Sequence, residues 1–341
     1  MTKLVSFRTS IKGVETSYLP SGEPTMLAVP YAETDADLKA ADVAFIGIPQ
    51  GSAATPGRDP AEWSDMGKGP LVTRRESMRY TGFLPEHDLD VFEHLAAVDM
   101  GDATIDPDNP KVGIESVMDM VGRALDAGCR IVTLGGSVPA ASYAVARGMA
   151  RATAGRIGII SLDAHGDAFD DIGAAWGNTE PGGGTWQRRM WEHAQNIDPA
   201  RHAEIGMRGP RNDRETLHLY RSNGALVFPA SEVAEDGMAA ICAKAISHVM
   251  AQATAGVDRT WVSLCMDVFD MGEFPDWGDE PLGLSARDVV RAVHESAKAG
   301  TDVLSIQFVA PNTPYPARLA VYLCVYQMAG WILGGHLPCK R

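Results

Sequence analysis

Short apolar segments bounded by turn-forming residues recur along the whole chain, and they constrain its fold more than any other feature. Each is nearly continuous and rich in Ile, Val and Leu, which is typical of strands buried on both faces of a parallel sheet. We predict strands over residues 43–48, 130–134, 157–162, 203–207, 225–228, 261–266 and 303–309.

Helical patterns lie between several of these segments. Two sets of apolar residues repeat at spacings of three and four, which places each set on one face of a helix. The sets are Val117, Met120, Val121, Ala124 and Leu125, and Met238, Cys242, Ala245 and Val249. Alternating strands and helices predict an α/β fold, a three-layer αβα sandwich around a mostly parallel sheet. In such a sheet the functional site lies beyond the carboxyl ends of the strands.

The composition narrows the class of protein and its partners. The chain has 341 residues and a formal net charge of −14, so nucleic acid and anionic membrane surfaces are repelled on average. Its five cysteines are scattered without a C-x-x-C pair, and the first residues carry no apolar leader. We therefore expect a cytoplasmic protein.

The apolar stretch 319–333 is too short for the ~20 residues of a membrane span, and we interpret it as a buried helix.

Glycine and proline gather in residues 49–70 and again in 177–184, and both clusters predict long loops at the rim of the sheet. Trp63 lies in the first loop, and Trp186 and Trp191 follow the second. Because tryptophan is enriched at interfaces, these side chains are candidates for contact with ligands or neighbouring subunits.

Candidate metal ligands follow directly after the predicted strand 157–162. If the extended conformation continues, Asp163, His165 and Asp167 point the same way, and they offer the mixed oxygen and nitrogen donors that divalent metals prefer. A polar loop whose carboxylates cap the next helix is an equally good interpretation of this cluster alone.

A second acidic cluster closes the predicted strand 261–266. Cys265 and Asp267 share a face by the two-residue alternation of a strand. No histidine lies at a recognised spacing from Cys265, so we interpret it as a buried structural thiol rather than a nucleophile. Two acidic clusters that each end a buried strand favour a metal site over a solvated surface.

At these residues the chain resembles the ureohydrolase family, the arginases and agmatinases. The resemblance runs from about residue 27 to 333 and rests on motifs in the family's order. They are Gly67-Lys68-Gly69-Pro70 with Arg74, Arg75 and Ser77, Asp99-Met100-Gly101-Asp102, Leu134-Gly135-Gly136, the Asp163 cluster, Gly184-Thr185, Ile205-Gly206-Met207-Arg208-Gly209, and the Cys265 cluster.

The resemblance implies an arginase-like sandwich over residues 27–341, preceded by an N-terminal extension of residues 1–26. It also implies the family's chemistry, in which two manganese or nickel ions activate a hydroxide that attacks a guanidinium carbon.

The chain departs from the family's pattern at four positions. Val138 stands where the family has a metal-binding histidine, and valine has no lone pair. Cys265 replaces an aspartate that bridges both ions, and a soft thiolate is a poor substitute on hard manganese. Gly183 replaces a histidine of the substrate loop, and Phe308 replaces a glutamate that receives the guanidinium.

Four of the family's six ligands remain by this correspondence: Asp163, His165, Asp167 and Asp267. We expect no ion or a single divalent ion in this chain. Without metal, the clustered carboxylates repel one another and at least one pKa rises, unless a basic side chain compensates.

We interpret the chain as a ureohydrolase-fold subunit with little catalytic power, the partner of a ligand-complete paralogue in a heteromeric, hexameric amidinohydrolase. The paralogue holds two nickel or manganese ions and hydrolyses a small guanidine or biguanide, releasing urea or guanylurea and an amine. This division resembles the guanidine and biguanide hydrolases of the metformin hydrolase type, with this chain as the metal-poor subunit. Two alternatives remain: an active enzyme with a single ion on Asp163, His165 and Asp267, aided by Cys265, and a non-enzymatic binder of a cationic guanidine ligand.

Overall fold

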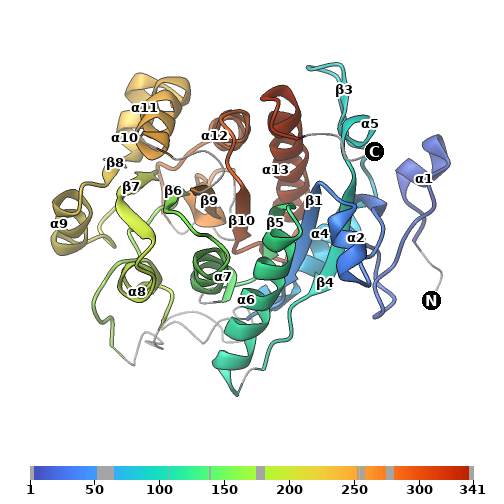
Figure 1. The fold of residues 1–341 in the computed structure, drawn as a ribbon. Helices are drawn as coiled ribbons and strands as arrows, with labels where there is room; N and C mark the ends of the chain where they lie inside the picture. Colours follow the sequence, from blue (N-terminus) through green and yellow to red (C-terminus); the bar gives the residue numbers. More distant parts are fainter. Residues whose placement is uncertain are drawn as a thin grey trace.

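One parallel sheet of eight strands runs through the centre of the molecule (Figure 1). The computed structural model describes residues 4–51, 65–106, 108–137, 140–173, 181–251, 253, 258–273 and 280–337. Neighbouring strands pair in parallel throughout the sheet. Their order across it is β4 (Ala97–Asp102), β1 (Val43–Ile48), β5 (Arg130–Gly135), β10 (Val303–Gln307), β9 (Arg259–Cys265), β6 (Ile157–Leu162), β7 (Ile197–Ile205) and β8 (Leu226–Phe228).

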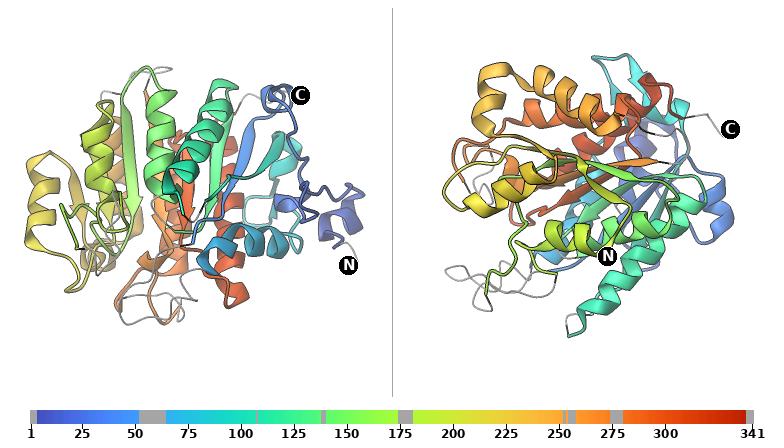
Figure 2. Two further views of the ribbon diagram at one scale, coloured as in Figure 1. Left: turned by 90° about the horizontal axis from the view of Figure 1, so that it is seen from below. Right: turned by 60° about the vertical axis from the view of Figure 1, so that its left-hand side comes forward.

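Helices cover both faces of this sheet, which confirms the predicted three-layer α/β fold (Figure 2). One layer contains α6 (Pro110–Asp126), α7 (Val145–Arg151) and α8 (Trp186–His193), and the other contains α4 (Gly69–Ser77), α11 (Met238–Met250), α12 (Ala286–Lys298) and α13 (Pro314–Leu333). Each layer packs on its own hydrophobic cluster. The shorter elements are α1 (Phe7–Lys12), α2 (Asp35–Lys39), β2 (Phe83–Leu84), β3 (Leu89–Asp90), α5 (Val91–His94), α9 (Arg214–Ser222) and α10 (Ala230–Asp236).

The predicted strands match the sheet closely, with two corrections. The segment predicted over 203–207 begins earlier, at Ile197, because the more polar residues before it also extend along β6. Strand β4 was missed because Asp99 and Gly101 interrupt its apolar pattern. Asp99 is nevertheless fully buried, since the Arg74 guanidinium donates to both of its carboxylate oxygens, at 2.8 and 2.9 Å.

Residues 66–77 are helical, so the long loop predicted over 49–70 is wrong in its second half. A 3-10 turn (Met66–Lys68) leads into α4, whose Pro70 suits the first turn of a helix. Residues 52–64, including Trp63, lie outside the described residues.

The long apolar stretch near the C-terminus forms the buried part of α13, as predicted. Fully buried side chains such as Leu323, Met328 and Trp331 pack this helix against the sheet and α12. Within the described residues, no helix has the length and apolar character needed to cross a bilayer.

The N-terminal segment is attached to the rest of the molecule by specific contacts. The backbone N–H of Phe7 donates to the carbonyl of Met78 at 2.7 Å, and Lys12 forms an ion pair of 2.8 Å with Asp90. The side chain of Ser6 caps α1 by accepting from the N–H of Thr9.

Candidate metal site at the carboxyl ends of β6 and β9

The register of two neighbouring strands creates the site. Leu162, the last residue of β6, lies opposite Leu264 of β9, so Asp163 comes next to Cys265 at the same edge of the sheet. A 3-10 turn (Met266–Val268) follows β9 at once and carries Asp267 back toward Asp163. Donor atoms of Asp163, Cys265 and Asp267 lie within 4.8 Å of one another. The two clusters predicted from the sequence are therefore one site.

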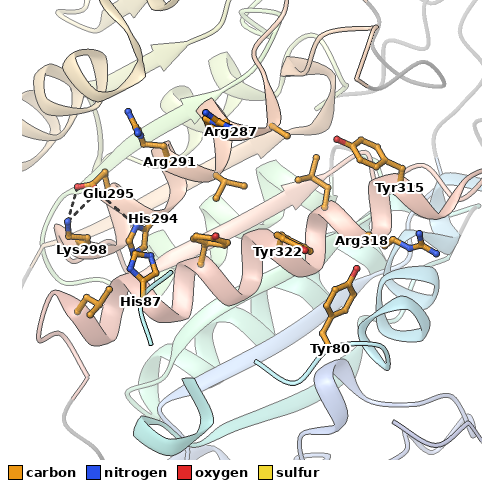
Figure 3. Close-up of a pocket in the computed structure, with 15 residues that line it drawn as sticks. Tyr80, His87, Arg287, Arg291, His294, Glu295, Lys298, Tyr315, Arg318 and Tyr322 are labelled. Carbon is orange, nitrogen blue, oxygen red and sulfur yellow. Dashed lines mark hydrogen bonds and ion pairs between the residues drawn. The ribbon is translucent and has the colours of Figure 1, made fainter. Parts of the chain in front are cut away.

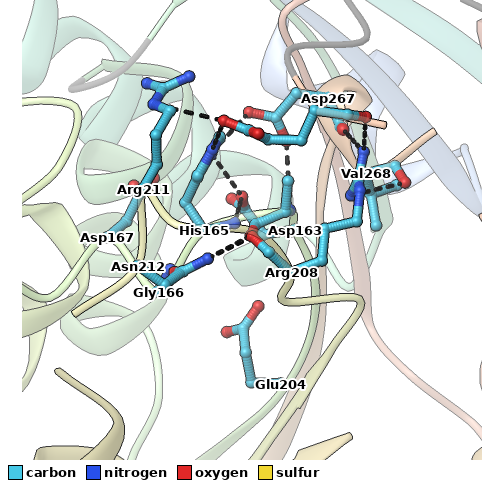
Figure 4. A network of polar contacts seen from close by, with 12 residues as sticks. Asp163, His165, Gly166, Asp167, Glu204, Arg208, Arg211, Asn212, Asp267 and Val268 are labelled. Atoms are coloured by element: carbon cyan, nitrogen blue, oxygen red, sulfur yellow. Dashed lines mark hydrogen bonds and ion pairs between the residues drawn. The ribbon is translucent and has the colours of Figure 1, made fainter. Parts of the chain in front are cut away.

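His165 completes one side of this cluster (Figure 4). Its Nδ1 lies 3.2 Å from Oδ2 of Asp267 and 3.8 Å from Oδ1 of Asp163. The backbone N–H of His165 donates to Asp163 at 2.8 Å, which fixes the turn that brings the ring over the carboxylates. The imidazole is 7% exposed, so its orientation is set by the protein rather than by solvent.

The side chain of Asp167 points away from the position that the other donors share. Its backbone has a positive φ of 44°, and its Oδ2 accepts a 2.9 Å hydrogen bond from the indole N–H of Trp186. Trp186 is fully buried at the start of α8 and packs near Trp261. The expectation that Trp186 contacts a ligand or subunit is wrong, because the side chain belongs to the core.

The thiol of Cys265 is neutral at physiological pH. Burial first, and the charges of Asp163 and Asp267 next, raise its pKa well above the usual range. This protonation describes the metal-free site, and in either state the soft sulfur is a poor ligand for hard cations such as manganese. The same pKa excludes Cys265 as a thiolate nucleophile.

The pKa values of two carboxylates in the cluster are raised, as the sequence predicts for a metal-free cluster. Burial and the Asp267 and Asp167 charges raise the pKa of Asp163 well above its usual range. Burial raises the pKa of Asp167 to about 7, although His165 and the Trp186 N–H act in the opposite direction.

The charge of His165 is coupled to that of Asp267. Burial acts to lower the pKa of His165, but the charge and hydrogen bond of Asp267 raise it overall. In the same pair, burial acts to raise the pKa of Asp267, but His165 lowers it overall. Without metal, an imidazolium is therefore the cation that partly compensates the cluster.

Arg208 holds the two halves of the site together. Its backbone N–H donates to the carbonyl of Ala164, and its guanidinium donates to backbone carbonyls on the far side. Those acceptors lie 2.8 to 3.2 Å away and belong to Asp267, Val268, Phe269, Glu280 and Pro281. The Arg208 side chain therefore links the end of β7 to the segments that carry Asp267 and Glu280.

A buried polar network supports the loop of Asp163 and Asp167 from below. The Tyr220 hydroxyl lies 2.5 Å from the carbonyl of Gly166, 2.5 Å from Oε1 of Gln187 and 3.3 Å from Oε2 of Glu204. His202 Nε2 lies 3.2 Å from the same Glu204 oxygen. All four side chains are fully buried, so the network fixes the loop from within the core.

The sequence analysis missed Glu204 and Glu280 as neighbours of the site. Glu204 lies within strand β7, where the alternation of side chains indicates only that Glu204 points toward the protein interior. Glu280 follows the segment 274–279, which is outside the described residues, and reaches His165 only through the fold. The one local indication for either residue was a charged side chain close to a quoted motif.

Of the four substituted positions, Cys265 lies within the donor cluster, and the structure describes two of the other three. Val138 lies outside the described residues. Gly183 is in the turn before α8, half-buried. Phe308 has a positive φ of 58° and its N–H donates to the carbonyl of Gly136 at 3.0 Å; its partly buried ring packs against both hydrophobic clusters.

The donor set fits one divalent cation. Asp163 and Asp267 supply hard oxygen ligands, and His165 Nδ1 faces both of them, a combination that suits manganese, nickel or zinc. A second ion would need a bridging ligand at Cys265, where a soft sulfur is a poor donor for hard cations, and one Asp167 oxygen is engaged by Trp186. A bound ion would supply Lewis-acid chemistry and lower the pKa of a coordinated water.

A cavity of about 940 Å³ lies elsewhere, over α12 and α13 (Figure 3). Among the described residues, none of the candidate metal ligands lines it. Its walls carry aromatic and basic side chains, including Tyr80, Arg287, Arg291, His294 and Tyr322. This cavity and the metal site are therefore separate features.

Known proteins share this sequence pattern over most of the chain. The model of the arginase family matches residues 41–328. Guanidinobutyrase of Pseudomonas aeruginosa is 25% identical over 301 residues, which are 86% of each chain. Proclavaminate amidinohydrolase of Streptomyces clavuligerus is 27% identical over 289 residues, covering 83% of this chain and 85% of that protein.

Solved structures agree with the fold. The structure of the Streptomyces clavuligerus proclavaminate amidinohydrolase has a TM-score of 0.77 at 22% identity and covers 92% of this chain and 98% of that one. Trypanosoma cruzi formiminoglutamase, solved with Mn²⁺, has a TM-score of 0.73 at 21% identity and covers 91% and 98%. With the family model matched over most of its length and the same sandwich around its sheet, this chain belongs to the arginase family.

Proposed function

We propose that this chain is the metal-poor subunit of a heteromeric amidinohydrolase that cleaves a C–N bond of a guanidine or biguanide. The observation that carries the proposal is the buried Cys265 thiol beside Asp163 and Asp267, where the family resemblance places a bridging carboxylate. A hydroxide held between two ions needs both cations, and this donor set supports one.

The preserved framework supports a subunit role rather than decay. Arg208 still links the two halves of the site through five carbonyl groups, and Arg74 still pairs with the buried Asp99. Both arrangements hold the arginase-like fold together while the donor set is reduced. A fold preserved in this way suits assembly with a ligand-complete paralogue in a hexamer of the metformin hydrolase type.

The names of two relatives, a guanidinobutyrase and an amidinohydrolase, support a guanidino compound as the substrate class. In this proposal the paralogue holds two nickel or manganese ions and releases urea or guanylurea and an amine. The present chain contributes interfaces and structure.

To test the proposal, this chain is expressed alone and together with a ligand-complete arginase-family subunit of the same organism. We expect the chain alone to hold at most one ion per protomer and to hydrolyse guanidines no faster than a metal-free blank. Co-expression should give a stable mixed oligomer with activity. Full hydrolysis by the single chain with two ions per protomer would overturn the proposal.

A second candidate function, a mononuclear hydrolase, is favoured by the convergence of His165 Nδ1 with Asp163 and Asp267. One variant separates the two. In a metal-poor subunit, Asp163→Asn leaves the activity of the mixed oligomer within about twofold, whereas the matching change in the paralogue abolishes it. In a mononuclear enzyme, Asp163→Asn itself abolishes turnover, because it removes a charged ligand.

A further inference from the structure

We infer that Glu280 is a positioning residue for His165, which it orients so that Nδ1 faces the cation held by Asp163 and Asp267. The inference rests on the single-cation site described above and adds a residue to it. Glu280 lies in no motif of the family resemblance, and its carboxylate is almost fully buried.

The imidazole of His165 has two differently placed nitrogens. Nδ1 faces Asp267 and Asp163, at 3.2 and 3.8 Å. Nε2, on the opposite edge of the ring, is buried and has no hydrogen-bond partner within the part of the chain that the structure describes. A buried ring N–H without a partner is costly, so a nearby acceptor is expected.

Glu280 is the carboxylate beside that orphan nitrogen. Its Oε1 lies 3.7 Å from Nε2 of His165, an ion-pair distance that is longer than the ~2.9 Å of a good hydrogen bond. Asp267 and Glu280 thus flank the same ring from opposite edges. A small movement of the Glu280 side chain suffices to close the contact.

The backbone holds Glu280 in this place. Arg208 Nη2 donates to the Glu280 carbonyl at 2.8 Å, which anchors the residue to the end of β7. Gly209 leaves room for the carboxylate, since a Cβ there would lie 3.1 Å from Oε2, and its φ of 73° suits glycine. Arg211 Nε lies 3.7 Å from Oε1 and balances the charge.

The physical role follows from the chemistry of imidazole. A neutral histidine carries its proton on one nitrogen and a lone pair on the other, and an acceptor at Nε2 stabilises the tautomer that leaves the lone pair on Nδ1. Loss of such a supporting carboxylate typically weakens metal binding 10- to 100-fold. Glu280 therefore sets both the tautomer and the angle of the ring.

The test measures Mn²⁺ and Zn²⁺ binding to the full chain by calorimetry for wild type, Glu280→Leu and Glu280→Gln. We expect Glu280→Leu to weaken binding about 10- to 100-fold and Glu280→Gln to recover much of it, because the amide oxygen still accepts from Nε2–H. Glu295→Leu, an exposed glutamate on α12, serves as the matched control and leaves affinity unchanged.

Nitrogen NMR of the His165 ring in the Zn²⁺-bound protein reports which ring nitrogen carries the proton. A purely structural role of Glu280 would not change this protonation pattern. Nε2 should carry the proton in wild type and in Glu280→Gln, and this preference should weaken in Glu280→Leu. If Glu280→Leu does not fold, Glu280→Gln still tests the inference. It should lose less metal affinity than Asp163→Asn, which removes a ligand, and it should keep the proton on Nε2.

Equal affinity and an unchanged tautomer in all folded Glu280 variants overturn the inference and leave the metal-poor subunit proposal in place. A wild-type chain that binds no divalent ion also overturns it, again without touching that proposal. Two ions per wild-type protomer overturn the proposed function, while the Glu280 variants still decide the inference.

Discussion

The indole N–H of Trp186 donates a 2.9 Å hydrogen bond to Oδ2 of Asp167. This contact ties a carboxylate of the metal cluster to a fully buried side chain of the core. In the proposed metal-poor subunit the site is therefore reduced in two ways, by the thiol at Cys265 and by the engagement of Asp167. The first change removes a ligand that the two ions would share, and the second engages one oxygen of a further carboxylate.

Restoring a carboxylate at position 265 should increase the affinity for divalent cations. Cys265→Asp adds a hard, charged ligand within reach of Asp163 and Asp267, so we expect at least about tenfold tighter Mn²⁺ binding by calorimetry. Cys265→Ser is the control, because it keeps the size without the charge. Equal gains in both variants would contradict this explanation.

The contribution of the metal-cluster carboxylates to the stability of the metal-free protein should fall as the pH rises from about 5 to 8. The raised pKa values of Asp163 and Asp167, the latter about 7, mean that the folded state holds protons that the unfolded chain releases near pH 4. The stability gained from these protons is present at low pH and is lost as the pH rises through the folded pKa values. The raised pKa of His165 acts in the same direction above about pH 6.5.

Thermal unfolding in EDTA across this pH range checks the sign. Added Mn²⁺ should flatten the profile, because a cation replaces the protons, and Asp167→Asn should make the metal-free profile shallower. Asp267 has the opposite dependence, since its lowered pKa gives stability that is lost as the pH falls. The same pH dependence of the unfolding temperature in wild type and Asp167→Asn, both in EDTA, would refute the assignment.

Removing the Arg208 side chain should destabilise the fold strongly. Arg208→Ala leaves five carbonyl groups without their charged donor, and we expect a loss of about 3 kcal/mol in the free energy of unfolding. Arg221→Ala, at an exposed position of α9, should change it by less than about 0.5 kcal/mol. Chemical denaturation measures both, and similar values for the two variants would show that the carbonyl contacts contribute little.

Tyr220→Phe should weaken the support beneath the metal loop. The change removes a buried hydroxyl from Gly166, Gln187 and Glu204, at a cost of about 1–3 kcal/mol in unfolding free energy. Tyr322→Phe, at a half-exposed tyrosine of α13, is the matched control. We also expect weaker Mn²⁺ binding in Tyr220→Phe, since Gly166 lies between His165 and Asp167. Unchanged stability and affinity would argue against a supporting role.

Local pattern was sufficient where apolar side chains bury one face or both faces of an element. The apolar segment of β1 and the helical repeat around Val117 in α6 gave elements that the structure contains. The apolar pattern did not predict β4, because Asp99 is a charged residue that is buried in an ion pair with Arg74. An ion pair between residues that are far apart in the sequence leaves no pattern in the local sequence.

The sequence by itself determined the α/β fold and the family, and it predicts that Cys265 replaces a bridging carboxylate, because these depend on residue type and order along the chain. The tertiary structure alone decided that β6 and β9 are neighbours, with Leu162 opposite Leu264, so that Asp163 meets Asp267. It also decided that Asp167 bonds to Trp186 and that Glu280 lies beside His165. Strand order in a parallel sheet is set by crossovers between distant segments, and distances across such crossovers are fixed only when the whole core is packed.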